Sequence, residues 1–142
     1  MRPGKALRWC GALALAFLGT QPAQATFHLM QIEQVTGGVC GDVNSQAIQL
    51  RMRTGFQQFV SAARLVAYDA QGLNPVLVID FVNDVPNGGV GVRILITTPQ
   101  FSLNHGPIPD FTMTNPIPAS YMAAGGSLLA RLGSVGRRTD ER

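Results

Sequence analysis

The chain has 142 residues, enough for one domain of ordinary size. Hydrophobic residues make up 46% of it and charged residues only 13%, which excludes a disordered polyelectrolyte. The formal charge of +3 comes from the two ends of the chain, because residues 26–130 hold four arginines against six carboxylates, a net charge of −2. Such a body argues against a broad nucleic-acid-binding surface, so we predict no nucleic-acid partner.

Residues 1–25 have the three parts of a secretory signal peptide. Basic residues lie in the first eight positions, the apolar run WCGALALAFLG follows at residues 9–19, and Ala23 and Ala25 suit a signal peptidase. We expect a signal-peptide helix cleaved before Thr26, with a buried N-terminal helix as the alternative. No later segment is apolar for long enough to cross a bilayer. The sequence therefore predicts a secreted or periplasmic protein whose mature chain has no transmembrane segment.

Short strands separated by glycine, asparagine and proline follow this leader. They are expected at residues 27–35, 46–53, 62–69, 76–82 and 92–98. In the clearest of them, residues 46–53, apolar and polar residues alternate with a period of two. Its apolar set is Ile48, Leu50 and Met52, and its polar set is Gln49, Arg51 and Arg53. The nearly continuous apolar run at residues 76–82 predicts a central strand that is buried on both faces.

The connections between these strands are too short for parallel crossover helices. We therefore predict an all-β fold, a small antiparallel immunoglobulin-like β-sandwich over residues 26–126. Prolines interrupt the chain after residue 99, where residues 110–114 favour a short edge strand and residues 118–124 a helical turn. The composition of residues 127–142 predicts an irregular, disordered basic tail.

Five short motifs resemble those of the lamin-tail domain, an immunoglobulin-like β-sandwich found in nuclear lamins and in many exported bacterial proteins. They are AIQL at 47–50, ARLVAYD at 63–69, VIDF at 78–81, PNG at 86–88 and RILI at 93–96. The resemblance covers residues 47–101, with Gln49 in place of the family's glutamate and no tryptophan in the second strand. It implies a binding or architectural module rather than an enzyme, and one similar to uncharacterised exported bacterial proteins.

The polar side chains of the clearest strand form a candidate binding face. Its members are Gln49, Arg51 and Arg53, with Gln46 one step along as a further candidate. Arginine binds carboxylate, sulfate or phosphate groups through two parallel hydrogen bonds. The alternative is an ordinary solvated sheet face.

The glycine-rich loop at residues 37–45 is a second candidate site. Asp42 and Asn44 supply oxygen ligands spaced by two, as in calcium sites, and the alternative is a turn closed by Asx hydrogen bonds. Cys40, in the same loop, is the only cysteine after residue 25 and so allows a disulfide-linked dimer.

Catalytic motifs are not evident in the sequence. It shows no nucleophile elbow, phosphate loop or metal-ligand spacing, so we predict no catalytic residue, no metal and no cofactor. Asp69 is expected to start a turn. Asp80 is interpreted either as an inward carboxylate paired with an arginine or as a group on the solvent face of an edge strand. The alternative to a binding module is a small secreted hydrolase that uses Asp80, Asp69 or His105.

These patterns predict an exported, non-catalytic β-sandwich module that binds a protein or an anionic surface polymer. A truncated relative of a longer exported protein is a further alternative, because the composition changes abruptly near residue 127. The sequence leaves the ligand, the oligomeric state and the oxidation state of Cys40 open.

Overall fold

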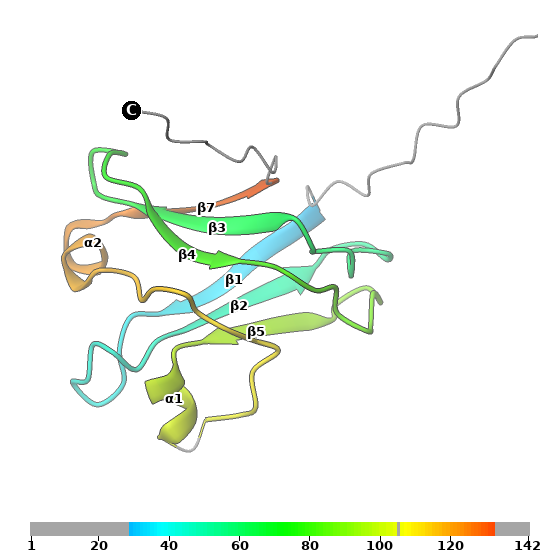
Figure 1. The fold of residues 1–142 in the computed structure, drawn as a ribbon, viewed down its shortest axis with the longest axis horizontal. Coiled ribbons are helices and arrows are strands. Elements are labelled where there is room, and N and C mark those ends of the chain that lie inside the picture. The colour runs from blue at the N-terminus through cyan, green and yellow to red at the C-terminus, as the bar shows by residue number, and fades with distance from the viewer. Residues whose placement is uncertain (1–28, 105, 133–142) are drawn as a thin grey trace, which may run out of the picture.

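The computed structural model describes residues 29–104 and 106–132, which form two β-sheets and two short helices (Figure 1). The strands in chain order are β1 (Met30–Thr36), β2 (Ala47–Met52), β3 (Ala63–Tyr68), β4 (Val76–Asp80), β5 (Arg93–Thr97), β6 (Phe111–Thr112) and β7 (Ser127–Leu132). The helices are α1 (Pro99–Leu103) and α2 (Ala119–Ala124). The described chain is mostly β, which confirms the predicted all-β class. The predicted signal peptide lies outside the described residues.

The strands pair in two separate sheets. The first has the order β1-β2-β5-β6 and the second the order β4-β3-β7. Neighbouring strands are antiparallel except β5 and β6, which are parallel. In β1 the register shifts between Ile32 and Gln34, so a bulge at Glu33 lets both Ile32 and Val35 pack on the core. The Glu33 side chain therefore lies on the outer face of the first sheet, where it meets Arg93.

One hydrophobic core is shared by the two sheets. Its fully buried side chains come from β2, β3, β4, β5 and the segments beside them, and include Ile48, Leu50, Met52, Val60, Leu65, Val78, Phe81, Ile94 and Ile96. Residues 113 and 114 join the sheets, because Met113 N–H donates to Thr97 O at 2.8 Å and Thr114 N–H to Val78 O at 2.8 Å. Ile48, Leu50 and Met52 all lie in this core, so the period-two alternation in the sequence predicted the buried face of β2 correctly.

The prediction of a central strand at residues 76–82 is wrong, because β4 lies at the edge of the second sheet and pairs only with β3. Its first two residues are half-buried and Asp80, its last, is exposed. Arg64 Nε lies 3.8 Å from Asp80 Oδ1, and the Asp80 side chain is 50% exposed. Asp80 therefore takes the solvent-facing edge position, with an arginine beside it. A continuous apolar run does not distinguish an edge strand from a central one, because the run itself does not show which strands will pair with it on either side.

Residues 127–132 correct the predicted tail, because they form β7 along the whole of β3. The pairing runs antiparallel from Tyr68 opposite Ser127 to Ala63 opposite Leu132. Leu128 and Ala130 alternate along β7 and pack against the core. The composition averaged over residues 127–142 hides this short apolar alternation. The rest of the predicted tail, residues 133–142, lies outside the described residues.

The strands define two ends of the molecule, which Figure 1 shows at the right and the left. The arginine end carries the β2–β3 loop (residues 53–62) and the β4–β5 loop (residues 81–92), and the helix end carries α1, α2, the β1–β2 loop and the β3–β4 turn. The five described arginines lie on strand residues, or in a loop, nearest the arginine end. They are Arg51, Arg53, Arg64, Arg93 and Arg131. No helix within the described ranges is long and apolar enough to cross a membrane.

Candidate anion-binding site

A single carboxylate organises the outer face of the first sheet. Glu33 Oε2 accepts hydrogen bonds from Arg93 Nε at 2.6 Å and from Gln49 Nε2 at 2.7 Å. Glu33 Oε1 accepts from Arg93 Nη2 and from Arg51 Nη1, both at 3.2 Å. Arg93 therefore holds Glu33 through two parallel hydrogen bonds, the geometry that matches a guanidinium to a carboxylate. The bulge in β1 brings Glu33 to side chains of β2 and β5 that are up to 60 residues away in the sequence.

These contacts fix the charge of Glu33. The hydrogen bonds from Arg93, then from Gln49, lower the pKa of the Glu33 carboxyl from 4.5 to about 2. Its side chain is 24% exposed, whereas the side chains of Arg51 and Arg93 are 38% and 50% exposed. Arg51 and Arg93 lie directly opposite each other in the β2–β5 register, where two like charges repel. Glu33 relieves this repulsion and leaves part of each guanidinium in solvent.

Arg53 adds a third guanidinium to this face. Its side chain is exposed, and its backbone N–H donates to Leu29 O at 2.9 Å. Its guanidinium makes no hydrogen bond or ion pair with any residue in the described ranges. Arg51 and Arg53 line a surface hollow of about 260 Å³ together with Val90 and Gly91. We call Arg51, Arg53 and Arg93, with Gln49 and Glu33, the guanidinium face; its three arginines and one carboxylate leave an excess of two positive charges.

Gln46 is not part of this face, contrary to its inclusion as a further candidate. Its side chain is 1% exposed. Its amide nitrogen donates to Val43 O and to Ile117 O, each at 2.8 Å, and its amide oxygen accepts from Ile117 N at 2.8 Å. Gln46 therefore fastens the segment before α2 to the start of β2, a structural role in the interior.

The glycine-rich loop at residues 37–45 forms a turn closed by hydrogen bonds. Asp42 Oδ1 accepts a hydrogen bond from Asn44 N–H at 2.9 Å, the Asx geometry, and Asp42 pairs with Val39 through the backbone. Cation binding by Asp42 and Asn44 stays a prediction. No group of three or more histidine, cysteine, aspartate or glutamate side chains is placed to hold a metal ion within residues 29–104 and 106–132. Cys40 is an exposed free thiol with φ of 51°.

The carboxylates considered for a hydrolase lie apart. Asp69 accepts hydrogen bonds from two backbone N–H groups and one side chain of residues 71–74, at 2.6–3.0 Å, and so closes the β3–β4 turn. The Leu73 N–H contributes most to lowering the pKa of its carboxyl. Asp80 is opposite Arg64 at the far end of β3, so about five strand residues, roughly 16 Å, separate the two carboxylates. His105, like Ala23, Ala25 and Thr26, lies outside the described residues.

Sequence reasoning identified two of the three arginines but missed Arg93 and Glu33. The sequence does hold a signal for Glu33, which is the only glutamate before residue 141 and lies in the strand before the one that carries Arg51 and Arg53. Consecutive strands are usually neighbours in space, so this glutamate could be expected near those arginines. No protein-family model, curated protein or solved structure matches this chain.

Proposed function

We propose that this chain is an exported, non-catalytic module, an immunoglobulin-like β-sandwich of lamin-tail type, whose guanidinium face binds an anionic surface polymer. The observation that carries the proposal is the local charge. The described residues hold five arginines against six carboxylates, yet three arginines share one sheet face with a single glutamate. Two sheets around one core, joined by short connections, support the fold part of the proposal.

The guanidinium face suits a polymer better than a single small anion. Glu33 holds Arg51 and Arg93 from one side, which reduces the side-chain freedom that binding would otherwise remove. Arg53 follows Arg51 by two residues, just after the end of β2, so their backbones lie no more than roughly 7 Å apart. Repeating carboxylate, sulfate or phosphate groups can therefore engage several guanidinium groups of one face together, and each additional contact strengthens the others.

Direct binding measurements with anionic polymers test this proposal. The probes are dextran sulfate, polyphosphate and polygalacturonate, with neutral dextran as the negative control. Arg53→Gln removes one exposed charge without breaking a hydrogen bond within the described residues, and we expect roughly tenfold weaker binding, with a smaller dependence on salt. Glu33→Gln removes the competing carboxylate, and we expect tighter binding because one more net positive charge outweighs the side-chain freedom that Arg51 and Arg93 regain.

A matched control separates the face from the net charge. Gln100→Glu, in α1 at the helix end, changes the net charge by the same amount as Arg53→Gln but lies away from the guanidinium face. We expect Gln100→Glu to bind as the unchanged protein does. Equal losses in the two variants would show that only the overall charge matters, and binding of none of the anionic probes would refute the proposed ligand class.

Export is a separate part of the proposal, and its support is the charged leader, apolar run and small residues of the sequence. Intact-mass analysis of secreted material should give a chain that begins at Thr26. A secreted chain that still begins at Met1 would contradict it. A broad hydrolase substrate screen on the same material distinguishes the binding module from the hydrolase alternative, since the module gives no turnover.

A further inference from the structure

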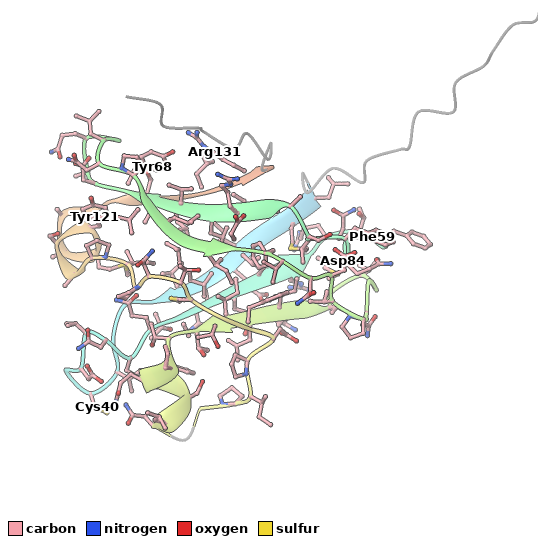
Figure 2. All side chains as sticks on the ribbon, viewed as in Figure 1. Cys40, Phe59, Tyr68, Asp84, Tyr121 and Arg131 are labelled. Atoms are coloured by element: carbon pink, nitrogen blue, oxygen red, sulfur yellow. The ribbon has the colours of Figure 1, made fainter. Side chains whose placement is uncertain are left out.

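Large apolar side chains face solvent on the two loops of the arginine end. Phe56 is 78% exposed, Phe59 52%, Val82 77% and Val90 73%. Figure 2 shows Phe59 projecting from this end, beyond the strands. Side chains of this size normally contribute to a core, so four of them on neighbouring loops indicate a contact that the isolated chain leaves unmade.

The two loops are held together by their backbones. Phe56 N–H donates to Gly88 O at 2.8 Å, and Val85 N–H donates to Gln58 O at 3.1 Å. A third bond joins Ser61 N–H to Asp84 Oδ1 at 2.8 Å. The Gln58 side-chain amide occupies the space that a Cβ at residue 88 would need, so glycine there permits the close approach. We call these joined loops, residues 53–62 and 81–92, the tip platform.

Phenylalanine is an unusual residue for the backbone conformation found at position 56. Its φ is 63°, in the left-handed region where glycine and asparagine are favoured and a bulky side chain is uncommon. Its ring gains little from burial, because 78% of the residue is exposed. Neither the local backbone nor the core therefore accounts for an aromatic side chain at this position.

The guanidinium face adjoins the tip platform. Val90 lines the same hollow as Arg51 and Arg53. The helix end also exposes apolar residues, among them Leu103 at 73%, Leu73 at 62% and Val43 at 50%. The charged groups of the helix end differ, however, because it carries Asp42 and Asp69, and Arg131 is the one described arginine whose guanidinium extends toward it, 5.5 Å from the centre of the Tyr68 ring. Exposed apolar groups thus lie beside a cluster of three arginines at the arginine end.

We propose that the tip platform docks on an anionic lipid bilayer, with its apolar side chains in the interface and the neighbouring arginines on the lipid phosphates. The proposal rests on the proposed function, since its arginines are those of the guanidinium face, and it goes beyond that function by adding an anionic lipid surface to the polymers. Phe56 and Phe59 supply the apolar area for shallow insertion, and arginines near an anionic leaflet add electrostatic attraction. Side chains that protrude from two loop tips suit the deformable interface of a lipid bilayer, because insertion there needs no cavity of complementary shape.

The platform also carries an acidic group, which limits how deep it can enter. Asp84 lies on the β4–β5 loop, labelled at the same end as Phe59 in Figure 2, and its carboxylate accepts the Ser61 N–H. A charged group so placed must stay among the headgroups. We therefore infer a protein that rests in the interfacial region with its strands above the lipid.

Vesicle sedimentation provides the first test, with protein recovered after export. The vesicles are phosphatidylcholine alone or equal parts of phosphatidylcholine and phosphatidylglycerol. We expect binding to the mixed vesicles, and at least about tenfold weaker binding for Phe56→Asn/Phe59→Ser, because two phenyl rings no longer leave water. Asparagine suits the left-handed backbone at residue 56, so this variant should stay folded. Leu103→Ser, at the helix end, removes a comparably exposed apolar residue and should bind normally.

A fluorescent reporter measures insertion itself. The chain has one tryptophan, Trp9, inside the predicted signal peptide. Phe59→Trp therefore places a reporter on the tip platform, and Leu103→Trp places the matched one at the helix end. Brominated lipids quench only a tryptophan that enters the bilayer, so we expect quenching of the Phe59→Trp protein and none of the Leu103→Trp protein.

Each result bears on one proposal or the other. Loss of vesicle binding in Phe56→Asn/Phe59→Ser, with dextran sulfate binding retained, supports docking through the platform. Vesicle binding that needs Arg53 but not the phenylalanines, without quenching at residue 59, overturns insertion. Polymer binding without any vesicle binding overturns the bilayer proposal and leaves the proposed function in place. Failure to bind vesicles and polymers alike overturns both.

Discussion

The two ends of this molecule use their polar side chains differently. At the helix end, polar groups turn inward: Gln46 holds the segment before α2, and Thr98 Oγ1 donates to Asn44 O at 2.6 Å. Asp69 is likewise occupied within its own turn. At the arginine end, guanidinium groups are partly exposed, and Arg53 has no side-chain partner among the described residues. The polar residues of one end complete the fold, while the guanidinium groups of the other remain partly exposed.

Exposed apolar residues occur at both ends, so exposure alone does not identify a binding surface. Leu103 at the helix end is nearly as exposed as Phe56 at the arginine end. The difference is the charge beside them, since the helix end offers Asp42 and Asp69 while the arginine end offers Arg51, Arg53 and Arg93. The combination of charge and apolar surface, rather than either one, distinguishes the arginine end.

Both ends share one core and should unfold as one cooperative unit, which Leu50→Asp tests most severely. Leu50 is 1% exposed in the shared core. An unpaired carboxylate there costs several kcal/mol, on the order of the total stability of a domain, so we expect the whole protein to unfold. Circular dichroism and tryptic digestion should report loss of both ends together. Gln49→Ser, its neighbour on the outer face, should stay folded. Digestion confined to one end would show that the ends fold separately.

Gln46→Ala should produce the next largest effect, and it acts at the helix end. The change removes three hydrogen bonds and leaves the backbone N–H and C=O of Ile117 buried without their partner. We expect a loss of about 2–4 kcal/mol in the free energy of unfolding, measured with urea. Arg53→Ala, at the arginine end, should change the same quantity by less than about 0.5 kcal/mol. Equal losses would contradict the distinction between inward and available polar groups.

Acid titration tests how much the ionised Glu33 carboxylate stabilises the guanidinium face. The pKa of Glu33 is about 2 in the folded protein, below its ordinary 4.5. A carboxyl group whose pKa is lower in the folded protein than in the unfolded chain stabilises the fold fully at pH values above its unfolded pKa. This contribution disappears as the pH falls through its folded pKa. The melting temperature of the unchanged protein should therefore exceed that of Glu33→Gln at pH 6, and the difference should shrink between pH 4.5 and 2. A constant difference across that range would show that Glu33 acts without its charge.

Local patterns in the sequence predicted the strands well. The alternation around Leu50 gave the buried face of β2 correctly, and the glycine, asparagine and proline residues between the strands expected at residues 76–82 and 92–98 separated β4 from β5. Two assignments failed because they depend on neighbours that are distant in the chain. β4 has the pattern of a central strand, but β3 is the only strand with which it pairs in the described part of the chain; residues 127–132 have the composition of a tail but pair with β3.

The candidate site was predicted only in part for the same reason. Alternation along one strand placed Gln49 and Arg51 on the outer face. It could not show that Glu33, from a bulged strand, meets Arg93 across 60 residues. The exposure of Phe56 was not predictable either, because the sequence does not show whether an aromatic residue in a loop between strands points into the core or into solvent. Contacts across strands and the direction of loop side chains arise from the tertiary fold, so no local pattern encodes them.

The smallest expected effect concerns a feature that the two ends share. Phe56 at the arginine end has φ of 63°, and Cys40 at the helix end has φ of 51°. Both are exposed residues in the left-handed region, which asparagine adopts at lower cost. Phe56→Asn and Cys40→Asn should therefore each raise the free energy of unfolding by about 0.5–1 kcal/mol, measured by chemical denaturation. Phe59→Asn, at a residue whose φ is not positive, provides the control and should give no gain.

These two substitutions separate stability from binding. If the phenyl ring of Phe56 belongs to a bilayer contact, Phe56→Asn should gain stability and lose affinity for phosphatidylglycerol vesicles, because the ring strains the free protein and contributes only when it leaves water. Cys40→Asn should gain similar stability and bind vesicles as before. A destabilised Phe56→Asn protein would mean that the ring packs on the platform, in spite of its 78% exposure. The ring would then belong to the fold, and the arginine end would differ from the helix end in charge alone.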